Sequence, residues 1–110
     1  MTKYLNAGAI LGTTPVDLFV CPENHQSIVH SLFVSTISDT EPCEVTIQVF
    51  DASQGRTYTV GNKIRVLPNK TLSFDKQINL ESNDILKVFS QSVDEVHVFA
   101  SIMTVLPASL

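Results

Sequence analysis

Residues 43–51, CEVTIQVFD, decide the fold class of this chain. Val45, Ile47 and Val49 alternate with polar residues, which is the period-two pattern of a half-buried β-strand. The β-branched side chains also match the known strand propensities. The loop ASQG at residues 52–55 then favours a hairpin into the run RTYTV. No window of the chain sustains the i, i+3, i+4, i+7 spacing of an amphipathic helix, so we predict an all-β protein.

The same alternation recurs along the rest of the chain. Between the runs lie PEN, SDTEP, ESND and SVDE, whose Pro, Asn, Asp and Ser residues favour turns. Seven to nine short strands at this spacing predict a single β-sandwich, and both an immunoglobulin-like and a jelly-roll topology fit. Residues 1–14 are expected to form an extended N-terminal arm and residues 15–110 the sandwich domain. The further strands are expected at residues 3–11, 16–21, 26–37, 56–60, 62–67, 70–75, 84–91 and 95–105.

Length and charge limit the classes of function. The 110 residues make one ordinary domain, and 44% hydrophobic and 16% charged residues are typical of a packed one. The seven Lys and Arg residues are scattered singly, so no basic stripe is available for a nucleic acid. No apolar run approaches the ~20 residues of a membrane helix. The N-terminus is too weakly apolar for a signal peptide, so we expect synthesis in the cytoplasm and no membrane partner.

The segment LFVCPENHQSIVHS at residues 18–31 suggests a metal site or a cysteine–histidine nucleophile. The spacing of Cys21, His25 and His30 matches no zinc-ligand pattern, whereas Pro22 and Asn24 are turn formers. We therefore expect a turn here and no metal ligand. A cysteine–histidine pair stays open, because such partners meet in space rather than along the chain. His30 lies in mid-strand, where a lone histidine is more often packed or at an interface.

Other chemistry-bearing motifs are missing. The chain has no G-x-G-x-x-G, no Walker loop and no G-x-S-x-G, so we expect no cofactor, no catalytic residue and no enzyme activity. Its turn carboxylates are expected to act as caps on a solvated rim, and a weak calcium site is the alternative. These carboxylates belong to Asp51, Glu81, Asp84, Asp94 and Glu95.

The two cysteines allow one bridge, from Cys21 to Cys43. Cys43 shares its strand face with Val45 and Ile47, so a small buried thiol is the competing interpretation. Both alternatives stay open at this point.

Apolar side chains lie on both faces of several expected strands. A two-layer domain of this size cannot bury both faces of its sheets by itself. We therefore predict an interface, covered by another subunit or by the N-terminal arm. The alternatives are scattered exposed apolar residues or a different strand register. The predicted interface residues are Phe50, Ile85, Phe89, Phe99 and Met103.

From residue 16 to residue 105, the order of segments resembles a family of small β-sandwich virion structural proteins of tailed bacteriophages. The strand SIVHSLFVS is followed by an edge strand VTIQVFD, a step LPNKTLSFD, then INLESNDILKVFSQS and a closing VDEVHVFASIMTV. The entry turn PENHQ and the two cysteines depart from the family pattern. Since these motifs describe packing and turns, no binding residue is carried over from the family.

The resemblance implies a capsid decoration (cement) protein that stabilises the shell through contacts between subunits. The implied partners are further copies of the chain, most simply as a homotrimer, and other virion proteins such as the major capsid protein. The implied location is the virion, after synthesis in the cytoplasm of the bacterial host. The alternative is a tail, neck or fibre protein that acts in attachment or in receptor or carbohydrate binding. The absence of Trp weakens a sugar platform.

Overall fold

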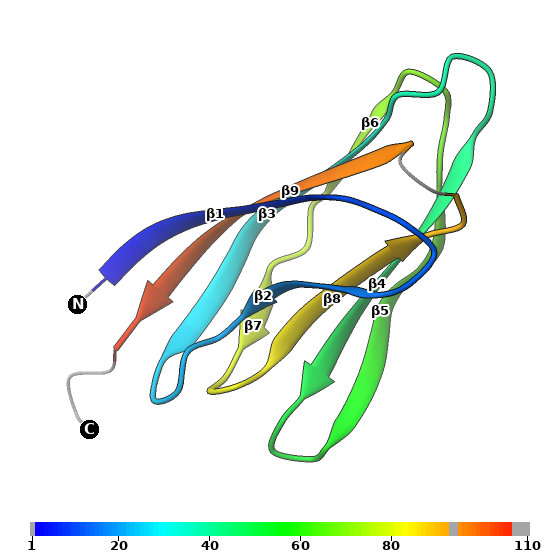
Figure 1. The fold of residues 1–110 in the computed structure, drawn as a ribbon. Coiled ribbons are helices and arrows are strands. Elements are labelled where there is room, and N and C mark those ends of the chain that lie inside the picture. The colour runs from blue at the N-terminus through cyan, green and yellow to red at the C-terminus, as the bar shows by residue number, and fades with distance from the viewer. Residues whose placement is uncertain (1, 93–94, 107–110) are drawn as a thin grey trace.

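Two antiparallel sheets packed face to face make up the computed structural model, which describes residues 2–92 and 95–106 (Figure 1). The described residues form nine strands, so the predicted all-β single sandwich is confirmed. None of them forms a helix of the length and apolar character that crossing a membrane requires. The strands are β1 (Thr2–Ile10), β2 (Val16–Val20), β3 (Gln26–Thr36), β4 (Cys43–Asp51), β5 (Arg56–Val66), β6 (Thr71–Phe74), β7 (Ile78–Leu80), β8 (Ile85–Ser90) and β9 (Val96–Val105).

The strand order identifies the topology. Sheet A has the order β1-β9-β3-β6, with β7 also paired to β3, and sheet B has the order β2-β8-β4-β5. The first strand therefore pairs with the last, the second with the next to last, and β4 with β5. A long hairpin rolled up in this way is a jelly roll, so the immunoglobulin-like alternative is excluded.

The core lies between the sheets and follows the predicted alternation. On β9, Val98, Ala100 and Ile102 point inward, and on β4 Val45 and Ile47 do the same. A fully buried side chain of this size contributes roughly 1.5–3 kcal/mol. The two inner faces thus hold the sandwich together, as the period-two pattern indicates.

Two strands differ from the expectation. The runs at residues 56–60 and 62–67 form one strand, β5, because register shifts against β4 absorb the break around Gly61. Lys63 adopts a φ of 49° there, and its N–H donates to Thr46 Oγ1 at 3.3 Å. Strand β7 was not predicted, since three residues are too short to display an alternation.

The proposed arm, residues 1–14, is largely paired within the sandwich. Thr2–Ile10 forms β1, which runs antiparallel to β9 from Thr2↔Val105 to Ile10↔His97. Leu11 is fully buried, and its N–H donates to the carbonyl of Val96 at 2.8 Å. Residues 2–10 therefore form an edge strand, and Leu11 belongs to the core. A role of this segment toward a neighbouring subunit stays a proposal.

Candidate interaction surfaces

The two cysteines lie at opposite ends of β8. The N–H of Cys21 donates to the carbonyl of Asp84, just before β8, whereas Cys43 Sγ lies 3.1 Å from Ser92 Oγ, just after it. Six residues of strand span about 20 Å, and a disulfide needs Cα atoms within about 7 Å. Both cysteines are buried and free. The Cys21–Cys43 bridge is therefore not formed, and the competing interpretation of buried thiols holds.

The cysteine–histidine pair is not formed either. The thiol of Cys21 contacts the main-chain carbonyl of His25 at 3.5 Å, while the imidazole Nδ1 of His25 bonds the carbonyl of Glu23 at 2.8 Å. Burial raises the pKa of Cys21 above its ordinary value of 9.0; the hydrogen bond from Ser27 opposes this, and the charge of Asp84 adds to it. The thiol therefore stays protonated at neutral pH and is a poor nucleophile.

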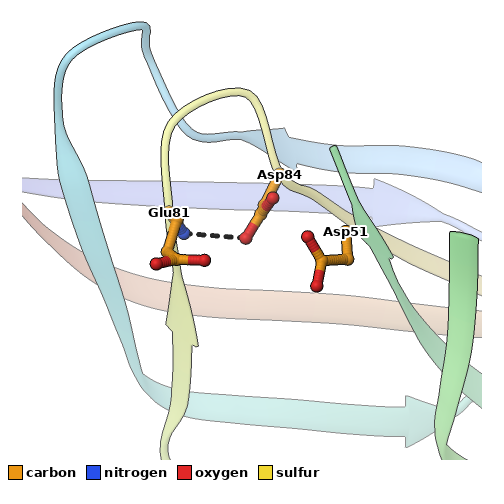
Figure 2. Close-up of side chains that lie close together, drawn as sticks. All are labelled: Asp51, Glu81 and Asp84. Atoms are coloured by element: carbon orange, nitrogen blue, oxygen red, sulfur yellow. Dashed lines mark hydrogen bonds between the residues drawn. The ribbon is translucent and has the colours of Figure 1, made fainter. Parts of the chain in front are cut away.

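Three of the turn carboxylates converge at one end of the sandwich, where Asp51, Glu81 and Asp84 lie side by side (Figure 2). One ligand oxygen from each lies within 4.8 Å of the others. Asp84 is buried, and its two oxygens accept N–H groups from Ala52 at 2.9 Å and from Glu81 at 2.8 Å. These bonds connect the β4–β5 hairpin of sheet B to the end of β7 in sheet A. The predicted cap role thus accounts for Asp84, whereas the predicted solvated position is wrong for this buried side chain. A calcium ion stays an untested alternative.

The other two turn carboxylates are not part of this cluster. Asp94 lies outside the residues that the structure describes. The main-chain carbonyl of Glu95 accepts the N–H of Ile37 at 2.9 Å, which extends the pairing of β3 with β9 beyond Thr36 and Val96.

A cleft of about 870 Å³ opens beside the acidic cluster, between β5 and β7. Its walls include Tyr58 and Val60 on the inner side of β5, which are 43% and 44% exposed. Since β6 and β7 are short, sheet A does not cover this part of β5. The cleft is thus apolar along one wall and acidic at one end.

The predicted interface residues point outward, but they divide between the two sheets. Phe50, Ile85 and Phe89 lie on the outer side of sheet B, where Phe50 and Ile85 are a cross-strand pair. Phe99 and Met103 lie on the outer side of sheet A. The five residues therefore cannot form one continuous surface, because the strand alternation does not reveal to which sheet a strand belongs.

Face A, the outer side of sheet A, consists of five rows that cross the strands. Facing partners in the register lie on the same side of an antiparallel sheet, and this defines each row. The rows are Ile10, His97, Ser35 and Thr71; Gly8, Phe99, Phe33 and Ser73; Asn6, Ser101 and Ser31; Tyr4, Met103, Ile28 and Asn79; and Thr2, Val105 and Gln26.

Face B, the outer side of sheet B, is organised in the same way. Between the edge strand β2 and β8 it holds an ion pair, in which Lys87 Nζ lies 2.9 Å from Asp17 Oδ1. The rows are Val20, Ile85, Phe50 and Thr57; Asp17, Lys87, Gln48 and Thr59; Phe89 and Thr46; and Glu44 and Arg65.

The two faces differ in their charged residues. The chain has 18 charged residues, 7 Lys or Arg and 11 Asp or Glu, yet the rows of face A contain none of them. Asp75 lies at its rim and accepts a hydrogen bond from Ser73 at 3.1 Å. Titratable side chains on face A are His97, Tyr4 and His30, which lies in the β3 bulge. An uncharged face with aromatic side chains is typical of the centre of a protein interface.

The aromatic residues of face A are exposed although they lie beside one another on neighbouring strands. Phe33 and Phe99 are directly opposed and are 40% and 48% exposed. Phe99 lies over Gly8, where an added Cβ would be 3.2 Å from the Phe99 ring. A hollow of about 430 Å³ lies beside them, lined by Gly8, Ile10 and their neighbours. Tyr4, 76% exposed, stacks on His30 with ring centroids 6.4 Å apart. Face A thus offers both a projecting ring and a hollow.

Comparisons with known proteins support the fold. No protein-family model and no curated protein matches this sequence. Solved structures do match. A chain of the "Acidic stable capsid structure of Helicobacter pylori bacteriophage KHP30" superposes with a TM-score of 0.58 at 11% identity, covering 96% of this chain and 89% of that one. A chain from "Bacillus endospore appendages form a novel family of disulfide-linked pili" gives a TM-score of 0.58 at 14% identity, with 94% and 85% covered.

A pentameric capsid protein isolated from metagenomic phage sequences overlaps less well. Its TM-score is 0.47 at 18% identity, with 92% of this chain and 59% of that chain covered. At these identities, the comparisons with a TM-score of 0.58 show a shared fold and nothing more specific.

Three exposed residues of face A do not emerge from the sequence pattern alone. Tyr4 and Ile10 fall within the expected arm, and Phe33 is simply part of an expected strand. The charge pattern contains the missing information, since SIVHSLFVS and VHVFASIMTV hold no Lys, Arg, Asp or Glu. Their pairing in one sheet turns this local feature into a continuous face.

Proposed function

We propose that this chain is a structural protein of a virus particle, and specifically a bacteriophage capsid decoration (cement) protein. The observation that carries the proposal is the uncharged aromatic face A on a jelly roll, a surface suited to binding another protein. The sequence resemblance to phage virion proteins supports it. The fold shared with a phage capsid structure is compatible with it, and jelly rolls recur in viral capsid domains.

Such a protein acts by burying surface rather than by turnover. Standard interfaces bury about 1,600 Å² in total, and many copies on one particle add avidity. The proposed partners are further copies of the chain and the major capsid protein. A homotrimer is the simplest closed arrangement at a three-fold position of a shell. This role requires no catalytic residue, metal or cofactor, and it places the protein in the virion after synthesis in the host cytoplasm.

The N-terminal segment is proposed to contact a neighbouring subunit. Within residues 2–92 and 95–106, strand β1 pairs with β9 on one edge only, so its other edge offers N–H and C=O groups to a further strand. Deleting residues 2–10 should weaken incorporation into particles while the sandwich stays folded. The deletion stops before Leu11, because that side chain belongs to the core. Unchanged incorporation would contradict the proposal.

A tail, neck or fibre protein that acts in attachment is the second candidate. The specific observation in its favour is that face A combines Phe33 and Phe99 with uncharged hydroxyl and amide groups, for example Ser35 and Asn6. Sugars bind to such combinations through ring stacking and neutral hydrogen bonds, and jelly rolls also occur in lectins. Binding on a glycan array would favour this candidate.

Gold-labelled antibody against the protein, applied to purified particles and viewed by electron microscopy, tests the location. Label distributed over the shell is the result expected for a decoration protein. Label confined to the tail or neck would support the second candidate, and particles without label would remove the virion proposal. A gain in the heat stability of particles on adding the purified protein would further support the cement role.

A further inference from the structure

We propose that a second copy of this chain covers face A, with the two sheets stacked around a two-fold axis along the row Asn6, Ser101 and Ser31. The inference rests on the homo-oligomeric part of the proposed function. It does not depend on the particle, so purified protein can test it. The contact is separate from a trimer ring, because a two-fold contact joins two chains or two rings.

Charge favours a second copy as the occupant. The chain carries a formal charge of −4, so most contacts between two copies bring like charges together. Face B would bring four charged side chains of each copy, Asp17, Lys87, Glu44 and Arg65, into the contact. Stacking face A on face A buries no Lys, Arg, Asp or Glu from its rows, so no ion loses its hydration there. This face therefore allows two copies of the chain to meet without burying a charged side chain of its rows.

Shape favours the same arrangement. A two-fold axis along the middle row reverses the strand direction and keeps the order of strands. It places the row that contains Gly8 and Phe99 over the partner copy's row that contains Tyr4 and Met103. The projecting ring of Tyr4 then faces the hollow beside Gly8, and Phe99 faces a methionine, a favourable sulfur–aromatic combination. Tyr4 thus meets a small residue, and Phe99 meets a flexible one, across the roughly 10 Å that separates stacked sheets.

The area is sufficient for a specific contact. Four strands at about 4.8 Å spacing and nine residues at about 3.3 Å per residue give a flat footprint of roughly 570 Å² per copy. Side-chain relief adds to this value. The total approaches the lower limit of about 1,200 Å² for stable interfaces, so we expect a dissociation constant in the micromolar range.

The first experiment is sedimentation equilibrium of the full chain between about 1 and 200 μM. Complexes of two or six copies are the expected result. A monomer throughout, or a three-copy complex without any even-numbered species, would overturn the two-fold contact. Neither of these results bears on particle labelling, so the failure of this inference and the failure of the proposed function are distinguishable.

Two matched substitutions test the face. Phe99→Lys on face A and Val20→Lys on face B alter residues of nearly equal exposure, 48% and 47%. The first should raise the dissociation constant at least about tenfold, and the second should change it less than about twofold. Equal effects, or a larger effect of Val20→Lys, would refute the assignment to face A. Tyr4→Lys serves as a second variant, because a residue that is 76% exposed can be changed without loss of folding.

Cross-linking tests the axis itself. Ser101 lies on the proposed axis, so Ser101→Cys should place two cysteines opposite each other and give covalent dimers with a short bifunctional maleimide. Gln48→Cys on face B is the matched control, since both positions are partly buried. The native Cys21 and Cys43 are buried and should react slowly. Dimers from the control but not from Ser101→Cys would contradict the proposed geometry.

Discussion

Face A and face B belong to the same sandwich and each presents an opposed pair of large apolar residues, but these pairs have different surroundings. On face B, Phe50 and Ile85 are partly buried and lie one row away from the ion pair of Lys87 with Asp17. On face A, Phe33 and Phe99 are exposed and their rows hold no permanent charge. Alternation alone therefore shows which residues point outward, whereas exposure and charge show which of them lack a cover.

Both faces rest on one core between the two sheets. Substitution of Asp84 should have the largest effect on the stability of that core. Its carboxylate accepts N–H groups of Ala52 and Glu81, which belong to turns of different sheets. Asp84→Ala leaves both donors without this partner and should lower the free energy of unfolding by about 3 kcal/mol. Urea denaturation measures the loss.

The control for this prediction is Glu81→Gln. The side chain of Glu81 is exposed and lies near two other carboxylates, so its neutralisation should change the free energy of unfolding by less than about 0.5 kcal/mol. A loss for Asp84→Ala no larger than that of the control would show that the two sheets do not depend on this connection.

The two opposed pairs are compared directly by a matched set of double substitutions. Phe50→Ser with Ile85→Ser should cost about 3 kcal/mol of folding stability, because both side chains are partly buried. Phe33→Ser with Phe99→Ser should cost about half as much in dilute solution but should abolish self-association. Urea denaturation at low protein concentration and sedimentation measure the two effects. If the double substitution on face B abolished self-association instead, face B and not face A would form the contact between copies.

A substitution of Gly8 tests the hollow on face A, with a smaller expected effect on self-association. A Cβ at this position would lie 3.2 Å from the ring of Phe99, and larger side chains would also fill the hollow. Gly8→Val should therefore weaken self-association about tenfold, or about 1.4 kcal/mol, as measured by sedimentation. Gly12→Ala is the control, since a Cβ added there would have no heavy atom within 4 Å beyond its chain neighbours. Unchanged self-association of the Gly8→Val variant would contradict the proposed contact between Tyr4 and the hollow.

Local pattern was sufficient for the strands that bury one face. The alternation along β4, β8 and β9 predicts their inward and outward residues, because a strand that is buried on one side has a period of two. On β3 the bulge at His30 shifts the alternation by one residue, so the pattern holds only on either side of it. The local pattern was not sufficient where pairing with a neighbouring strand decides the structure. β5 continues through Gly61 because β4 tolerates register shifts, and β7 exists because β3 offers it three residues of pairing.

The candidate sites depend even more on topology. Asp51 and Asp84 lie far apart in the sequence and meet because β4 ends where β8 begins. Phe33 and Phe99 are opposed only because β3 and β9 are neighbours. The charge-free composition of these two strands is the sequence feature that could have identified face A in advance.

The ion pair on face B provides the smallest expected effect and the final contrast with face A. Lys87 and Asp17 are in contact at 2.9 Å, but the side chain of Asp17 is 51% exposed, so water and salt screen the attraction. Asp17→Asn should therefore lower the free energy of unfolding by less than about 0.5 kcal/mol, and the difference should shrink as salt is raised in urea denaturation experiments. Self-association through face A should stay unchanged. A loss of more than about 1 kcal/mol, or weaker association, would mean that the charges of face B contribute to an interface and are not simply solvated.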